Sequence, residues 1–150
     1  MNGTPASGHE FRVMPVNSYE KKTILVVDDD PAVRSLIVEA LRQGGDYIAT
    51  EAADGREALE ALSSNLYDLV ITDIHMPGMN GMDLLGRIRE IHPTISVILI
   101  TAFPSVGLSV SAMKTGAVDF ITKPFQVDEL LYKVNIYLRE KSLLSVDGLL

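Results

Sequence analysis

The chain has 150 residues, 47% of them hydrophobic and 22% charged, which is the composition of one folded domain rather than of a disordered chain. Its 13 basic and 20 acidic residues give a net charge of −7, which argues against direct binding to nucleic acid. Cysteine is absent, which excludes disulfides and thiolate metal sites, and no apolar run approaches the length that spans a bilayer. We therefore expect a cytoplasmic protein without a membrane partner, since the first residues also lack the pattern of a secretory signal.

Residues 1–21 mix Gly, Pro, Ser and Asn without a hydrophobic period, which predicts a disordered leader. The apolar run at 23–27 predicts a buried strand, and it ends in Asp28-Asp29-Asp30-Pro31. Apolar residues then recur at helical spacing until Gly44-Gly45. We expect a strand, an acidic turn and a helix whose N-cap is Asp30.

The same order of strand and helix recurs along the rest of the chain. Further strands are expected at 47–52, 69–73, 95–100 and 119–121, each followed by a helix with one apolar face. Pro104 is expected to open the fourth helix, in which Gly107 costs roughly 1 kcal/mol relative to alanine. A folded domain is expected over 22–140, with 141–150 as a tail or the start of a linker. This alternation predicts an α/β, doubly wound, five-stranded parallel sheet in the flavodoxin-like order 2-1-3-4-5, with helices on both faces.

In that order the first, third and fourth strands are neighbours, and polar side chains meet at their carboxyl ends. Asp28, Asp29 and Asp73 would lie together there, with Thr101 beside them and Lys123 following the last strand. Crowded carboxylates need a compensating cation, and ligands that are all oxygen suit Mg²⁺ or Mn²⁺. We therefore expect Asp73 to act as a nucleophile toward phosphorus. Lys123 and the Thr101 hydroxyl would hold the phosphoryl oxygens.

As a set, these motifs resemble the receiver domain of bacterial two-component response regulators, and the resemblance covers about 22–140. Its texture is closest to receivers that are joined to AAA+ transcriptional activators. The segments that carry it are Ile24-Leu25-Val26-Val27-Asp28-Asp29, Asp73-Ile74-His75-Met76-Pro77-Gly78-Met79-Asn80-Gly81, Thr101-Ala102 and Lys123-Pro124-Phe125.

The resemblance implies a phosphoacceptor signalling domain, not an enzyme, which catalyses only its own phosphorylation and dephosphorylation. Asp73 would take phosphate from a histidine kinase or a phosphotransfer protein. Asp29 and Asp73 would ligate Mg²⁺ together with the backbone carbonyl of His75, and Asp28 would assist through water. The His75 side chain itself is interpreted as a loop histidine, because it has no His or Cys partner at ligand spacing. Thr101, Ala102 and Lys123 would contact the phosphoryl group, and the peptide bond before Pro124 is expected to be cis.

The resemblance also implies a conformational switch, in which Thr101 moves toward the phosphate and Phe120 turns inward. Because Phe120 lacks the hydroxyl of tyrosine, this switch would depend on packing alone. The face formed by the helix at 106–113, the strand at 119–121 and the last helix would change, and a homodimer can form through it. Phe103 and His75 would flank the phosphoryl group, and we expect Phe103 to cover it and slow its hydrolysis.

Two other interpretations stay open at this point, and a third, a flavodoxin, fails on charge. A haloacid-dehalogenase-type phosphatase also uses an aspartate and Mg²⁺, but its Asp-x-Asp-x-Thr motif is absent from Asp28-Asp29-Asp30-Pro31-Ala32. A flavodoxin needs a Ser/Thr/Gly-rich phosphate loop where this chain has carboxylates. A receiver-like binding module would keep the fold without phosphorylation. The chain is expected to be either a stand-alone receiver or a fragment of a longer protein.

Overall fold

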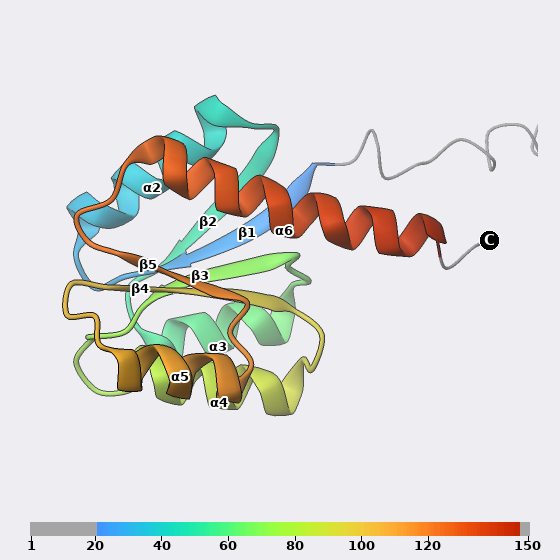
Figure 1. Cartoon of the computed structure of the whole chain (residues 1–150). Coiled ribbons are helices and arrows are strands. Elements are labelled where there is room, and N and C mark those ends of the chain that lie inside the picture. Colours follow the sequence, from blue (N-terminus) through green and yellow to red (C-terminus); the bar gives the residue numbers. More distant parts are fainter. Residues whose placement is uncertain (1–20, 148–150) are drawn as a thin grey trace, which may run out of the picture.

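The computed structural model describes residues 21–147, with side chains described for 21–139 (Figure 1). The predicted leader, except for Lys21, lies outside the described residues. Five strands form one parallel sheet in the order β2-β1-β3-β4-β5, as predicted. Their bounds are β1 (Lys22–Val27), β2 (Tyr47–Ala52), β3 (Leu69–Asp73), β4 (Ser96–Thr101) and β5 (Asp119–Thr122).

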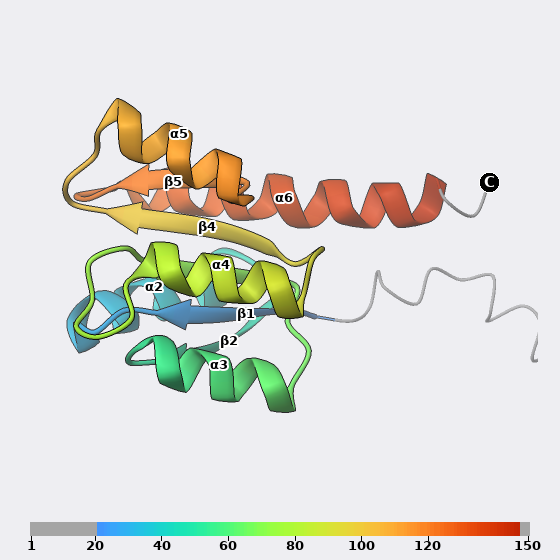
Figure 2. The same ribbon diagram turned by 90° about the horizontal axis from the view of Figure 1, so that it is seen from below.

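Helices cover both faces of this sheet. The helices are α2 (Pro31–Gly44), α3 (Gly55–Ser64), α4 (Gly81–Ile91), α5 (Val106–Thr115) and α6 (Val127–Asp147). Helices α2 and α6 lie on one face, and α3, α4 and α5 lie on the other (Figures 1 and 2). This arrangement agrees with parallel strands joined by helical crossovers.

The two cores are supplied by alternate residues of the same strands. Leu25 and Val70 point into the core beneath α3, α4 and α5, whereas Ile24 and Ile71 point into the core beneath α2 and α6. All five residues of β3 are buried, because this strand lies between β1 and β4 and is covered on both faces. The continuous apolar runs seen in the sequence therefore correspond to strands in the interior of the sheet.

Two predicted helix boundaries differ from the structure. The fourth predicted helix begins at Val106 rather than at Pro104, because Ser105 is its N-cap and accepts a hydrogen bond from the Leu108 N–H. The last helix continues to Asp147, into the segment that was predicted to be a tail, and it projects beyond the sheet (Figure 1).

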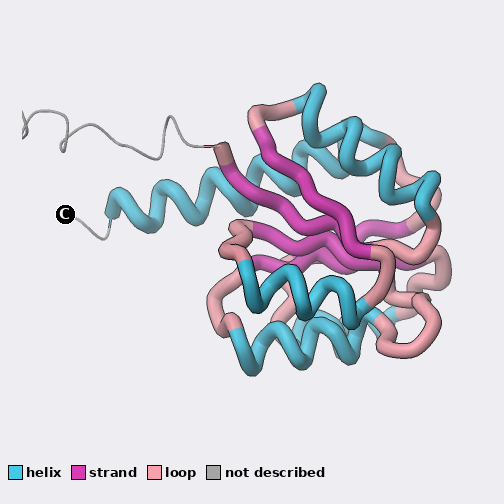
Figure 3. Tube along the Cα trace, turned by 180° about the vertical axis from the view of Figure 1, so that it is seen from behind, coloured by secondary structure: helices cyan, strands magenta, loops and turns pink. Residues whose placement is uncertain are grey.

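The carboxyl ends of the strands all point the same way, and loops gather there (Figures 2 and 3). The register places Val27 beside Thr72 and Asp73 beside Ile100. Residues directly after β1, at the end of β3 and at the end of β4 are therefore neighbours in space although they are far apart in sequence.

Candidate acidic metal site

An acidic cluster lies at this edge of the sheet. Asp28 directly follows β1, Asp29 follows it, and Asp73 is the last residue of β3. One carboxylate oxygen from each of the three lies within 4.8 Å of the others. Asp28 and Asp73 are buried and Asp29 is exposed, so the cluster opens to solvent on one side. Such a set of oxygen donors fits a hard divalent cation.

Lys123 reaches this cluster from the loop after β5. Its Nζ lies 3.1 Å from Asp28 Oδ2 and 3.4 Å from Asp73 Oδ2. The Lys123 backbone N–H donates to the Thr101 carbonyl at 2.7 Å, and the Lys123–Pro124 peptide bond is cis. One ammonium group thus bridges the two buried carboxylates.

The electrostatics of the site leave it with excess negative charge. Burial raises the pKa of Asp73, and the nearby charge of Asp28 raises it further, although Lys123 and a hydrogen bond from the His75 N–H oppose the shift. Burial by itself lowers the pKa of Lys123, but its contacts with Asp28 and Asp73 outweigh that effect, and the net pKa is raised. Lys123 is therefore an ammonium ion that compensates only part of the charge around it.

The backbone at Asp73 leaves no room for a side chain at Gly81, the first residue of α4. A Cβ on Gly81 would lie 2.3 Å from the Asp73 carbonyl oxygen and 2.7 Å from Ile74 Cα. The Gly81 N–H donates to the Ile74 carbonyl at 2.8 Å, and Gly78 has a φ of 75°. Asn80 then caps α4 by accepting a hydrogen bond from the Asp83 N–H. These contacts hold the end of β3 against the start of α4.

The switch hydroxyl expected at Thr101 does not reach the acidic cluster in this structure. Thr101 is fully buried, and its Oγ1 accepts a hydrogen bond from the Phe103 N–H at 3.0 Å. Within residues 21–139 no hydrogen bond joins this hydroxyl to Asp73 or Lys123. Ala102, next to it, is exposed. In this structure the hydroxyl is thus engaged with the loop that follows β4.

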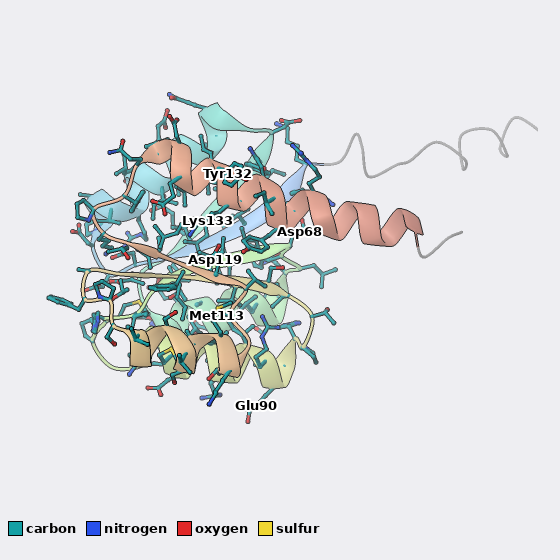
Figure 4. All side chains as sticks on the ribbon, in the orientation of Figure 1. Asp68, Glu90, Met113, Asp119, Tyr132 and Lys133 are labelled. Carbon is teal, nitrogen blue, oxygen red and sulfur yellow. The ribbon has the colours of Figure 1, made fainter. Side chains whose placement is uncertain are left out.

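Phe120 lies half-buried on β5, with its ring against the core beneath α3, α4 and α5. Its carbonyl accepts a hydrogen bond from Lys133 of α6 at 3.1 Å, and Lys133 also pairs with Asp119 at 3.2 Å (Figure 4). A groove of about 420 Å³ runs beside the ring, lined also by Pro104 before α5 and by residues of α5 that include Val106. The backbone of β5 is thus hydrogen-bonded to α6, while the Phe120 ring borders a groove along α5.

His75 and Phe103 contact each other. Their ring centroids are 5.2 Å apart and the ring planes meet at 84°, which is an edge-to-face contact. Both side chains are exposed, and His75 is not part of the acidic cluster. The interpretation of His75 as a loop histidine agrees with this placement, and Asp30 is the N-cap of α2, as predicted.

One residue beside the cluster was not singled out in the sequence. The Arg34 Nη1 donates to the Asp28 backbone carbonyl at 2.7 Å, and its Nε donates to Glu51 Oε1 at 3.0 Å. The available signal was a basic residue one helical turn after a run of three carboxylates. That signal indicates proximity to the acidic turn but does not identify the acceptor.

The model of the response regulator receiver domain family matches residues 24–135. The chain belongs to this family. The receiver is 41% identical over 110 residues to the DNA-binding transcriptional regulator NtrC of Escherichia coli, which covers 73% of this chain and 23% of NtrC. It is 35% identical over 126 residues to the probable transcriptional regulatory protein TcrX of Mycobacterium tuberculosis, covering 84% of this chain and 53% of TcrX. The receiver therefore spans from about a quarter to about half of the length of these curated relatives.

Solved structures agree with the assignment. A CheY-like receiver domain from Methanospirillum hungatei matches with a TM-score of 0.77 and 32% identity, over 81% of this chain and 96% of that one. The protein is thus a response regulator receiver domain of a two-component system. Neither the phosphatase, the flavodoxin nor a module without phosphorylation is supported by these comparisons. No helix within residues 21–147 is both long and apolar enough to cross a membrane.

Proposed function

We propose that Asp73 accepts a phosphoryl group from a phosphohistidine of a histidine kinase or a phosphotransfer protein. The observation that supports this most directly is Lys123 Nζ, which lies within 3.4 Å of carboxylate oxygens of both Asp28 and Asp73 in an acidic cluster. An ammonium held there is placed to neutralise phosphoryl oxygens as Asp73 attacks. Membership in the receiver family supports the same assignment.

In the proposed step, an Asp73 carboxylate oxygen attacks phosphorus as the bond between phosphorus and the imidazole nitrogen breaks. The electron pair of that bond leaves with the imidazole, and an aspartyl-phosphate forms. The His75 N–H donates to the Asp73 carboxylate and orients it. Lys123 keeps its proton throughout, because its contacts with Asp28 and Asp73 raise its pKa. Hydrolysis by water then releases inorganic phosphate and returns the free carboxylate.

The residues of the cluster fit Mg²⁺, with Mn²⁺ as a substitute. Their donors are all oxygen, and the raised pKa of Asp73 indicates a charge that Lys123 does not fully compensate. Asp29, Asp73 and the His75 carbonyl would hold the cation, and Asp28 would assist through water. When bound, Mg²⁺ supplies neutralisation of charge on the phosphoryl oxygens.

Phosphorylation would alter the face formed by α5, β5 and α6. The Thr101 hydroxyl would leave the Phe103 N–H for the phosphoryl group, with Ala102 beside it, and the Phe120 ring would turn further inward. Alpha-helix α5 carries an exposed apolar stripe of Val106, Val110 and Met113, which suits a homodimer through this face.

The proposal also includes the extent of the domain, its location in the cell and its relation to DNA. The receiver would extend over 22–140 and act in the cytoplasm. The net charge of −7 argues against direct binding of nucleic acid by the receiver, so we expect any output at DNA to pass through another domain or partner. NtrC is named as a DNA-binding regulator, and the receiver covers 23% of its length.

Labelling with a small phosphodonor tests the proposal. Wild-type protein in Mg²⁺ should gain the mass of one phosphoryl group by intact-protein mass spectrometry, and Asp73→Asn should not, because an amide cannot supply the attacking oxygen. A chelator should abolish labelling of the wild type.

Asp46→Asn is the matched control, because the Asp46 side chain is 82% exposed and the residue lies directly before β2, away from the carboxyl ends of the strands. It should be labelled like the wild type. Acid-stable, base-labile phosphate on Asp73→Asn would refute the assignment of the phosphoacceptor, and full labelling in the chelator would refute the role of the metal.

A further inference from the structure

Arg34 joins three elements at the acidic edge of the sheet. It lies within the second turn of α2, donates to the Asp28 carbonyl at 2.7 Å and pairs with Glu51 of β2 at 3.0 Å. Its side chain is only 17% exposed. One guanidinium thus links α2 to the end of β1 and to β2, and its planar fork suits two acceptors in fixed directions.

Of the three aspartates in the acidic cluster, Asp29 has the fewest contacts that fix its carboxylate. Asp28 is fixed by Lys123 and by a hydrogen bond from the Asp30 N–H at 2.9 Å, and Asp73 is fixed by Lys123 and by the His75 N–H. Asp29 is exposed, and within residues 21–139 no hydrogen bond or ion pair involves its carboxylate. Its direction therefore depends on its backbone.

That backbone is held through the peptide that joins Asp28 to Asp29. Because a peptide unit is planar, a hydrogen bond to the Asp28 carbonyl also orients the Asp29 N–H and the bond to Asp29 Cα. The preceding peptide is held separately, since the Asp28 N–H donates to the Ala52 carbonyl at 3.2 Å. Arg34 thus holds the peptide unit that directly precedes Asp29 Cα, the atom that carries the Asp29 side chain.

We propose that Arg34 is a positioning residue for the metal site, which holds the Asp28–Asp29 peptide so that the Asp29 carboxylate faces the cation. The inference rests on the proposed Mg²⁺ site. Arg34 contributes no ligand, and it acts through the backbone in the way that outer-shell partners orient metal ligands.

The proposal and simple electrostatics predict opposite changes in Mg²⁺ affinity when Arg34 is replaced. By charge alone, loss of a cation beside an acidic cluster makes that cluster attract Mg²⁺ more strongly. By positioning, loss of Arg34 lets the Asp28–Asp29 peptide rotate and weakens Mg²⁺ binding. Arg34→Gln therefore separates the two effects, and Arg34→Lys separates them again because it keeps the charge.

The experiment is calorimetric titration of the full chain with MgCl₂, with circular dichroism to check folding. We expect Arg34→Gln to bind Mg²⁺ roughly tenfold more weakly than the wild type, at the low end of the roughly 10–100-fold range for outer-shell partners. Arg34→Lys should also bind more weakly, because an ammonium cannot reproduce the fork. Arg42→Gln is the matched control, since Arg42 lies in the last turn of the same helix and donates to Ala49.

Equal or tighter Mg²⁺ binding by folded Arg34→Gln would overturn the inference, as would wild-type affinity in Arg34→Lys. If Arg34→Gln does not fold, the lysine variant decides the question. Absence of Mg²⁺ binding by the wild type would instead refute the proposed metal site itself, so the two failures are distinguishable. Equal weakening in Arg42→Gln would show that any loss of an arginine contact on this helix has the same effect, and it would also overturn the inference.

Discussion

At the residue scale, the charge on Asp73 opposes folding when no metal is present. Burial and Asp28 raise its pKa above the ordinary 3.8, so the folded chain holds this proton more tightly than the unfolded chain does. Stability then falls as the pH rises from 3.8 through the raised pKa, and the loss is complete above it. The proposed phosphoacceptor is thus kept at a cost in stability.

We therefore expect Asp73→Asn to raise the Tm at pH 7 in a chelator, because a neutral amide escapes both burial of charge and repulsion by Asp28. The gain should shrink as the pH is lowered toward 3.8, where the wild-type carboxyl becomes protonated. Thermal denaturation at several pH values measures this, with the exposed Asp46→Asn for comparison. A Tm equal to or below that of the wild type at pH 7 would contradict the direction of the shift.

Also at the residue scale, the contact between Phe103 and His75 bears on the lifetime of the phosphate. The two rings meet edge to face, although the Phe103 side chain is 70% exposed. In the proposed function, an apolar ring here limits the approach of water and cannot orient it. The prediction that Phe103 slows hydrolysis stays a prediction.

Phe103→Glu should shorten the lifetime of the aspartyl-phosphate by about tenfold, equivalent to roughly 1.4 kcal/mol in the barrier, by placing a polar group that orients water. The measurement is the decay of phosphorylated protein by mass spectrometry after the donor is removed. Phe103→Leu, which stays apolar, should decay slowly, and His75→Asn tests the other ring. Decay of the wild type as fast as that of Phe103→Glu would show that the ring does not shield the phosphate.

At the scale of elements, α5 is the helix that is least anchored to the body. Ala112 is its one buried residue, whereas α4 buries Gly81, Leu84, Leu85 and Ile88. Leu108 also packs against the core while partly buried, and the caps Ser105 and Gly116 and intrinsic helix propensity add to the stability of α5. Such a helix is suited to move when the loop after β4 changes.

Gly107→Ala should stabilise the receiver by about 0.5–1 kcal/mol, because alanine is the better helix former. A Cβ at Gly107 would meet no atom within 4 Å, so there is no steric cost. Urea denaturation measures the change. Gly86→Ala in α4 should give a similar gain, since a Cβ there also meets nothing within 4 Å. Loss of stability in both would contradict this account of the two helices.

Gly81→Ala should have the opposite effect. Its Cβ would lie 2.3 Å from the Asp73 carbonyl, a backbone atom that cannot move aside freely. We expect a loss of about 1–3 kcal/mol, as for overpacked sites, together with weaker phosphorylation because the end of β3 shifts. Urea denaturation and phosphodonor labelling on the same preparation check both parts, and unchanged values in both would refute the steric account.

At the scale of the whole molecule, α5 and α2 lie on opposite faces of the sheet and differ in how much apolar surface they expose, although α6, beside α2, also exposes Tyr132. On α5, Val106, Val110 and Met113 are 83%, 46% and 48% exposed, whereas α2 exposes Leu36. The α5 face also includes the groove beside Phe120. An exposed stripe of this kind favours the α5 side for self-association.

If the homodimer forms there, Val110→Glu should weaken it at least tenfold, or by about 1.4 kcal/mol, because a charge would be buried at the interface. Analytical ultracentrifugation with Mg²⁺ and beryllofluoride, a phosphoryl mimic, measures this. Leu36→Glu on α2 is the control, and it should dimerise like the wild type. If Leu36→Glu lost the dimer and Val110→Glu kept it, the interface would be on the opposite face.

The residues of the candidate site could be named from the sequence because they are polar residues that lie at the ends of recognisable strands. Asp28 and Asp73 each follow an apolar run, and parallel topology requires such ends to converge. The state of Thr101 could not be predicted, because its bond to the Phe103 N–H depends on the conformation of a loop. Arg34 was missed for a related reason, since its acceptor is a backbone carbonyl, which no residue type reveals.

The sequence by itself determined the order of strands and helices, the sheet topology and the family. Buried parallel strands appear as continuous apolar runs and amphipathic helices as apolar residues at helical spacing, and both patterns can be read locally. It also determined which carboxylates and which lysine converge, since the crossover rule leaves few topologies. Only the tertiary structure decided that Lys123 bridges Asp28 and Asp73 while the Thr101 hydroxyl bonds elsewhere. Directions and distances of side chains depend on contacts between segments far apart in the chain, and a periodic pattern along one segment carries no information about them.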